Sequence, residues 1–239
     1  MKARGKHSRT ARLAVVVAAV VVLAAVLVAP ALAAPAQPTS WTVSPESKTI
    51  TYGQGVTLNG TLMSNGVAVG GLWVDFAQAM TEGGSYEVLY KVTTSDSAYY
   101  SGTYSVAVMP LQTMYYRFQW AGDSIYADSN SDVIPVSVKP SLGKPTYPSS
   151  VKSGHKFTVS GSVKPGAPTG PKVKVKAYRY NGHGYVNYKT YSTTISGTTY
   201  KASIKISKTG KYKFKATTGS SAQFVANETS LGAVLKIKG

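Results

Sequence analysis

Short runs of alternating apolar and polar residues fill the chain after residue 40. Clear examples, in which lysines alternate with apolar residues, are Lys172–Tyr178, Lys211–Ala216 and Leu235–Lys238. Successive side chains of a strand point to opposite faces of a sheet, so each run has one apolar face and one charged face. Gly, Pro, Asn and Ser separate the runs at the short spacing typical of sandwiches and barrels. The pattern predicts an all-β protein made of antiparallel β-sandwiches.

The N-terminal segment lacks this alternation. Leu13 to Ala29 is continuously apolar, follows a basic segment and is ended by Pro30. A basic segment, an apolar segment and a site with small residues define a secretory signal peptide. We therefore expect residues 1–33 to be a signal peptide cut after Ala33, with Ala36 as the second choice. The alternative is an uncleaved membrane anchor, since the apolar run is near the shortest that spans a bilayer.

The rest of the chain contains an internal repeat. Residues 53–62 (GQGVTLNGTL) are similar to residues 154–163 (GHKFTVSGSV), and both halves carry an aromatic triplet later on, Tyr116-Arg-Phe118 and Tyr212-Lys-Phe214. A segment with two prolines, residues 139–145, lies between the halves and is typical of a stiff linker. We expect two domains, residues 41–139 and 141–239, each able to fold alone.

The second part of each repeat resembles strand F of immunoglobulin domains, whose pattern is D-x-G-x-Y-x-C. Gly210 and Tyr212 match this pattern, and Phe214 replaces the cysteine. The chain is thereby similar to the tandem bacterial Ig-like repeats of secreted and cell-surface proteins, mainly actinobacterial ones. Further residues that carry the resemblance are Tyr52-Gly53, Val69-Gly-Gly71, Tyr116-Arg-Phe118 and residues 121–129.

The resemblance implies two tandem immunoglobulin-like antiparallel β-sandwiches. It implies that Tyr212 is a corner tyrosine, which ties the turn before strand F to that strand. It also implies that Val159 takes the place of the second cysteine, so that apolar packing against Phe214 replaces a disulfide. The family has no common catalytic site.

The two halves differ in net charge. Residues 34–139 hold four basic and eight acidic side chains, whereas residues 140–239 hold seventeen basic side chains and one acid, Glu228. Strand periodicity places lysines of the second half on one outer face, which we predict to be a polyanion-binding surface free of carboxylates. These residues are Lys172, Lys174, Lys176, Lys211, Lys213, Lys215, Lys236 and Lys238. The alternative is that outward lysines only keep the sheet soluble and protect its edges.

Aromatic residues provide a second candidate feature. Tyr178 and Tyr180 lie among the basic residues and could stack on bases or sugars, although tyrosine is also a common strand residue. Trp73 should be exposed beside Tyr115 if its neighbours Val74 and Phe76 are core residues, and it would then be a stacking platform for a glycan or a domain contact. A shift of the register by one residue would instead place Trp73 in the core.

A candidate calcium site is formed by Asp123, Asp128 and Asp132, which lie close together in the sequence. Their spacing lacks the order of a dedicated calcium loop, and such aspartates also hydrogen-bond to turn backbone. The chain contains no cysteine, so a disulfide or a thiolate nucleophile is excluded. His155 and His183 lie outside any known catalytic motif, so we expect no enzyme and no cofactor.

These patterns together predict a secreted, non-enzymatic protein that binds an anionic polymer of the cell wall or extracellular matrix through residues 141–239. It would be extracellular, loosely associated with the cell wall, and without a membrane span once the signal is removed. The alternatives are a structural spacer and an accessory module that docks to a protein partner.

Overall fold

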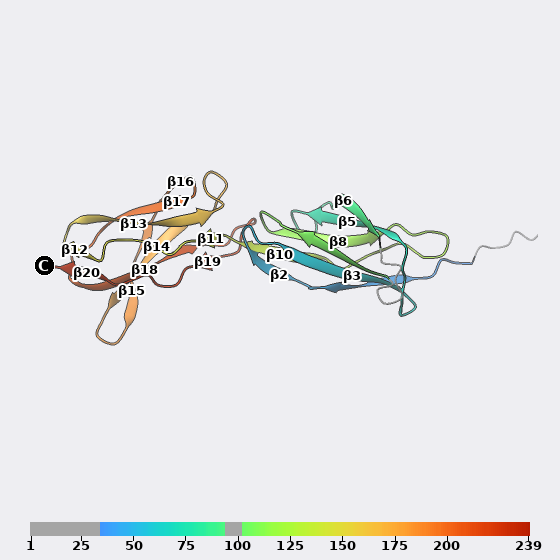
Figure 1. Cartoon of the computed structure of the whole chain (residues 1–239), viewed down its shortest axis with the longest axis horizontal. Helices are drawn as coiled ribbons and strands as arrows, with labels where there is room; N and C mark the ends of the chain where they lie inside the picture. The colour runs from blue at the N-terminus through green and yellow to red at the C-terminus, as the bar shows by residue number, and fades with distance from the viewer. Residues whose placement is uncertain (1–33, 94–101) are drawn as a thin grey trace, which may run out of the picture. The chain divides into compact units, whose positions relative to one another are not determined.

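The computed structural model describes residues 34–93 and 102–239, and all the regular structure in these residues is β-strand (Figure 1). This confirms the all-β class. The predicted signal peptide lies outside the described residues. Within the described ranges, the structure has no helix with the length and apolar character needed to cross a bilayer.

The first half forms two sheets. One sheet joins β1, β3 and β4 in that order, with β7 also paired to β3, and the other has the order β2-β10-β8-β5-β6, with β9 paired to β8. All pairs are antiparallel except β2 with β10, which is parallel. The strands are β1 (Thr39–Ser44), β2 (Lys48–Thr51), β3 (Val56–Ser64), β4 (Val67–Ala68), β5 (Trp73–Ala79), β6 (Glu87–Thr93), β7 (Thr103–Val108), β8 (Met114–Trp120), β9 (Ser129–Asn130) and β10 (Ile134–Lys139).

The second half repeats this arrangement. Its sheets have the orders β11-β13-β17-β16 and β12-β20-β18-β14-β15, with β19 paired to β18 and β12 parallel to β20. The strands are β11 (Ser141–Leu142), β12 (Ser150–Lys152), β13 (Lys156–Lys164), β14 (Val173–Tyr180), β15 (Tyr185–Ser192), β16 (Thr194–Ser196), β17 (Thr199–Lys205), β18 (Gly210–Thr218), β19 (Asn227–Glu228) and β20 (Leu235–Lys238). Among the described strands, none of the first half pairs with a strand of the second half.

Each half encloses a core between its two sheets. In the second half, Val159 of β13 and Val175 and Phe214 of the facing sheet are fully buried in one apolar cluster. Tyr212 is also fully buried, and its hydroxyl donates a hydrogen bond to the carbonyl oxygen of Lys208 at 2.8 Å. The alternating pattern therefore predicted the buried faces correctly, and the tyrosine ties strand β18 to the turn before it as expected.

One position of the repeat must be glycine in both halves, for the same steric reason. Gly60 of β3 is paired with Tyr104, and Gly161 of β13 is paired with Tyr200. In both places a Cβ atom would overlap the tyrosine ring, so only glycine leaves room for the ring. This shared pair supports the internal repeat at the level of packing.

The loop between β18 and β19, residues 219–226, leaves the second sandwich and packs on the first. Phe224 of this β18–β19 loop is 4% exposed and belongs to the apolar cluster of the first half. Gln223 accepts a hydrogen bond from the backbone of Thr113 at 2.8 Å, and Val225 donates one to Val138 at 3.0 Å. Residues Gln37–Gly239 accordingly form one compact unit, and independent folding of the two halves stays a prediction.

Candidate functional site

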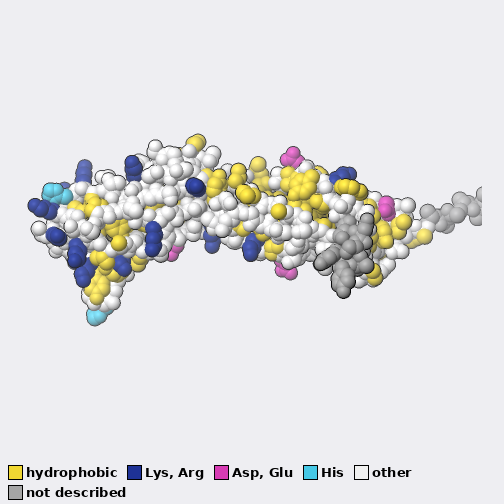
Figure 2. All heavy atoms as spheres, in the orientation of Figure 1, with side chains coloured by type: hydrophobic (Ala, Val, Ile, Leu, Met, Phe, Trp, Pro, Cys, Tyr) yellow, Lys and Arg dark blue, Asp and Glu magenta, His cyan; other side chains and the backbone are white. Residues whose placement is uncertain are grey.

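The lysines singled out from the sequence lie together on one sheet of the second sandwich. Strands β14, β18 and β20 are direct neighbours, as expected. In Figure 2, Lys and Arg side chains are more numerous over the second half than over the first. We call these side chains the lysine face; they are Lys174 and Lys176 on β14, Lys211, Lys213 and Lys215 on β18, Lys236 and Lys238 on β20, and Lys172, which immediately precedes β14.

The register of these strands sets like charges opposite one another. Lys176 is paired with Lys215 across β14 and β18, and Lys211 is paired with Lys236 across β18 and β20. Like charges directly opposite across strands destabilise a sheet. The face is extended at its edge by Lys152 of β12, which is paired with Lys238. An anion placed over these pairs would lower the electrostatic energy of the sheet.

The expectation that no carboxylate lies on this face is wrong. The short strand β19 pairs with β18 and sets Glu228 opposite Thr217, so that its carboxylate lies 2.7 Å from the Lys215 ammonium. The hydrogen bond from Lys215 lowers the pKa of Glu228, and the same bond raises the pKa of Lys215. Glu228 is therefore ionised at neutral pH and offsets one lysine of the face.

Tyrosine rings lie between the lysines. The ammonium of Lys215 lies 5.5 Å from the ring centre of Tyr178, and that of Lys211 lies 5.7 Å from the ring of Tyr180. Lys213 lies closer to a third ring, that of Tyr185 on β15, at 4.7 Å. These are cation–π distances, so the rings hold the lysine side chains along the face.

Trp73 is on the other sandwich and does not belong to the lysine face. It is 62% exposed on β5, while Val74 and Phe76 are fully buried, as expected. The expected neighbour Tyr115 is wrong, because the register of β5 and β8 sets Tyr115 opposite Ala79 at the far end of β5.

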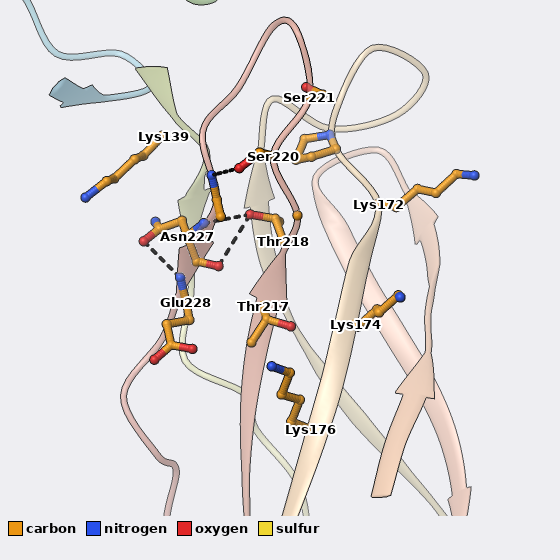
Figure 3. Close-up of a pocket in the computed structure, with 13 residues that line it drawn as sticks. Lys139, Lys172, Lys174, Lys176, Thr217, Thr218, Ser220, Ser221, Asn227 and Glu228 are labelled. Atoms are coloured by element: carbon orange, nitrogen blue, oxygen red, sulfur yellow. Dashed lines mark hydrogen bonds between the residues drawn. The ribbon is translucent and has the colours of Figure 1, made fainter. Parts of the chain in front are cut away.

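A groove of about 940 Å³ lies at one end of the lysine face (Figure 3). We call it the lysine groove. Three lysines of the face line it together with Lys139, the last residue of β10, and with hydroxyl-bearing residues of β18 and of the β18–β19 loop. Its lining includes Lys139, Lys172, Lys174, Lys176, Ser220, Ser221, Asn227 and Glu228.

Hydrogen bonds fix the loop that forms one wall of the groove. The Ser220 hydroxyl oxygen accepts from the backbone of Ala226 at 3.2 Å, and the Ser221 hydroxyl oxygen accepts from the backbone of Phe224 at 3.1 Å. The Asn227 side chain donates to the carbonyl oxygen of Pro140 at 2.7 Å. The wall is thus built by local turns and by one bond to the linker. Sequence reasoning missed it, although the run Gly219-Ser-Ser after a strand is a signal for such a turn.

The three aspartates of the calcium candidate do not come together in the structure. Asp123 uses its carboxylate to accept hydrogen bonds from the backbone of Ile125 and Tyr126, both at 2.7 Å, and so shapes its own turn. Neither these aspartates nor any other three His, Asp or Glu side chains of residues 34–93 and 102–239 gather into a set that could hold a metal ion. The hydrogen bonds of Asp123 to the turn backbone are those that aspartates commonly form in turns.

A second hollow lies on the first sandwich and is apolar. Its volume is about 430 Å³, and its lining includes Met80, Tyr90, Met109 and Leu111. Met80, Met109 and Leu111 are 72%, 62% and 59% exposed, respectively. The sequence did not indicate this hollow, because its residues come from strand ends and from the turn between β7 and β8.

Comparison with known proteins adds no identification, since no protein-family model and no curated protein matches this chain.

Proposed function

We propose that the protein is a secreted, non-enzymatic binding protein that holds an anionic polymer of the cell wall or extracellular matrix on the lysine face. The observation that carries the proposal is the register of β14, β18 and β20, which gathers lysines on one exposed sheet surface beside a single carboxylate. The location rests on the signal-like residues 1–33.

The physical basis of binding is electrostatic. Exposed ammonium groups that repel one another gain when a polymer with regularly spaced negative charges covers them. Such binding depends little on the order of the polymer units, and it weakens as salt screens the charges. A merely solubilising face would mix both signs of charge, but the second half holds one acid against seventeen basic residues.

We propose further that both sandwiches are immunoglobulin-like. The support is the repeated strand order, the buried Tyr212 with its bond to the preceding turn, and the aromatic triplets of β8 and β18. A spacer with the same fold would need no concentration of like charge on one face, so a test of polyanion binding also separates these two functions.

The proposal is tested by two triple variants with equal charge loss. The face variant changes Lys174, Lys213 and Lys236 to Gln, and the control changes Lys156, Lys201 and Lys205 to Gln. The control lysines are exposed on β13 and β17, in the opposite sheet. We expect the face variant to lose far more affinity for immobilised heparin at physiological salt, with unchanged circular dichroism. Equal losses would mean that only the total charge matters.

A second candidate function is supported by the apolar hollow of the first sandwich. Exposed, adjacent methionine and leucine side chains are typical of protein-docking surfaces. We propose as the alternative that this hollow receives an apolar segment of a protein partner. A photo-crosslinking side chain at position 111 should then capture a partner in the native extracellular fluid, and the same group at position 201 should not.

A further inference from the structure

The lysine groove differs from the rest of the lysine face because it has walls and mixed chemistry. Its volume of about 940 Å³ is in the range of small-ligand sites. Figure 3 shows Lys172, Lys174 and Lys176 along one side, and Asn227 and Glu228 on the opposite side. A flat charged face needs neither walls nor hydrogen-bonding groups of both kinds to hold a polyanion.

The lysines that line the groove form no ion pair within the described part of the chain, where the ion pairs are Lys91 with Asp75 and Lys215 with Glu228. Lys172, Lys174 and Lys176 lie on one side of the groove, and Lys139 lies on the side of Asn227 (Figure 3). An ammonium group offers three hydrogen-bond donors. Three such groups along one side of the hollow favour an acid group with several oxygen atoms, such as a carboxylate, a sulfate ester or a phosphate ester.

The serine hydroxyls add further donors. Within the described residues, the oxygen atoms of Ser220 and Ser221 accept hydrogen bonds from the loop backbone. A hydroxyl that accepts still has its hydrogen to donate. Both hydroxyls can therefore donate to a bound oxygen atom without a change in the loop.

The opposite side of the groove offers an acceptor. Glu228 uses one carboxylate oxygen for Lys215, at 2.7 Å, and is exposed. An ionised carboxylate has about four acceptor sites, so several stay available to donors of a ligand. A chain of phosphates has no such donors and is repelled by this carboxylate, whereas a sugar ring carries several hydroxyl groups that can donate to it.

We propose that the lysine groove binds one acidic sugar unit of the polymer, with the lysines and serine hydroxyls on its acid group and Glu228 on its ring hydroxyls. This inference rests on the proposed function and assigns its substrate class, an acidic glycan. The first sandwich takes part in the site, because it supplies Lys139 and holds the groove wall through Phe224.

The test compares two probes and three variants of the mature chain by calorimetry. The probes are a heparin-derived tetrasaccharide and an inorganic polyphosphate of similar total charge. The groove variant is Lys172→Gln with Lys174→Gln. The matched control is Lys211→Gln with Lys236→Gln, which lies outside the groove on the same face. The third variant is Glu228→Gln, and thermal unfolding by circular dichroism checks the fold of all three.

We expect the groove variant to bind the tetrasaccharide about tenfold more weakly, as for the loss of charged hydrogen bonds, and the control to lose much less. Glu228→Gln should weaken tetrasaccharide binding but strengthen polyphosphate binding. Equal losses from groove and control variants, or stronger binding of both probes by Glu228→Gln, would overturn the sugar site while leaving polyanion binding intact. Failure of the wild type to bind either probe would overturn the proposed function and this inference together.

Discussion

Truncation of Phe224 to alanine should destabilise the first sandwich, although Phe224 lies in the second half of the sequence. Phe224 follows β18 of the second sandwich, but its side chain is buried in the core of the first. Backbone bonds to Thr113 and Val138 on either side of it hold the loop in place. The loop therefore cannot easily collapse into the space that the ring leaves.

The magnitude follows from this rigidity. Replacing a buried phenylalanine by alanine costs about 3–5 kcal/mol, and the cost is highest where the surroundings cannot relax. Phe224 is 4% exposed, so nearly the full loss of buried surface applies. For a domain of about 100 residues, such a loss lowers the melting temperature by more than about 10 °C.

The tryptophans provide a selective assay. All three tryptophans, Trp41, Trp73 and Trp120, are in the first half. Tryptophan fluorescence in a urea titration therefore reports the first sandwich, and circular dichroism reports both. Phe224→Ala should shift the fluorescence transition to a lower urea concentration. The reasoning is refuted if this transition stays at the wild-type midpoint, because Phe224 would then contribute nothing to the first core.

Other predictions concern the second sandwich and the separate halves. Phe214→Ala should lower the free energy of unfolding of the second sandwich by about 3–5 kcal/mol, measured by circular dichroism. The tryptophan fluorescence transition should stay in place if the halves unfold separately. A loss below about 1 kcal/mol would contradict the core position of Phe214. Tyr212→Phe should cost about 0.5–1.5 kcal/mol of unfolding free energy, since it removes the hydrogen bond to Lys208. An unchanged free energy of unfolding would mean that this hydrogen bond does not stabilise the fold. Expressed separately, residues 35–139 and 141–239 should each unfold cooperatively, the former at a lower midpoint without Phe224; a molten fragment that binds ANS would indicate one fused domain.

The sequence predicted the features that depend on strand periodicity. Alternation identified the buried partners Val175 and Phe214, and the adjacency of β14, β18 and β20 followed from the resemblance to immunoglobulin-like domains. Side-chain direction in a strand is a local property, so a short run of sequence suffices to determine it.

The features that sequence reasoning missed depend on loops and on register. Glu228 lies beside Lys215 only because β19 folds back on β18, and Phe224 reaches the first core through a segment with no periodic pattern. Tyr115 was wrongly set beside Trp73 because the pairing of β5 with β8 depends on turn lengths far from both residues. The lysine groove combines these long-range contacts and has no local signature.

The salt dependence of polyanion binding tests the central claim most directly. The affinity of the mature protein for heparin should be measured from low salt to above physiological salt, alongside the face variant Lys174→Gln, Lys213→Gln and Lys236→Gln. We predict that the logarithm of the binding constant falls linearly with the logarithm of salt concentration, and that the slope of the variant is smaller by about 2, as for the loss of three ionic contacts. A wild-type affinity that does not change with salt, or no binding at physiological salt, would contradict the assignment of the lysine face as a polyanion-binding surface.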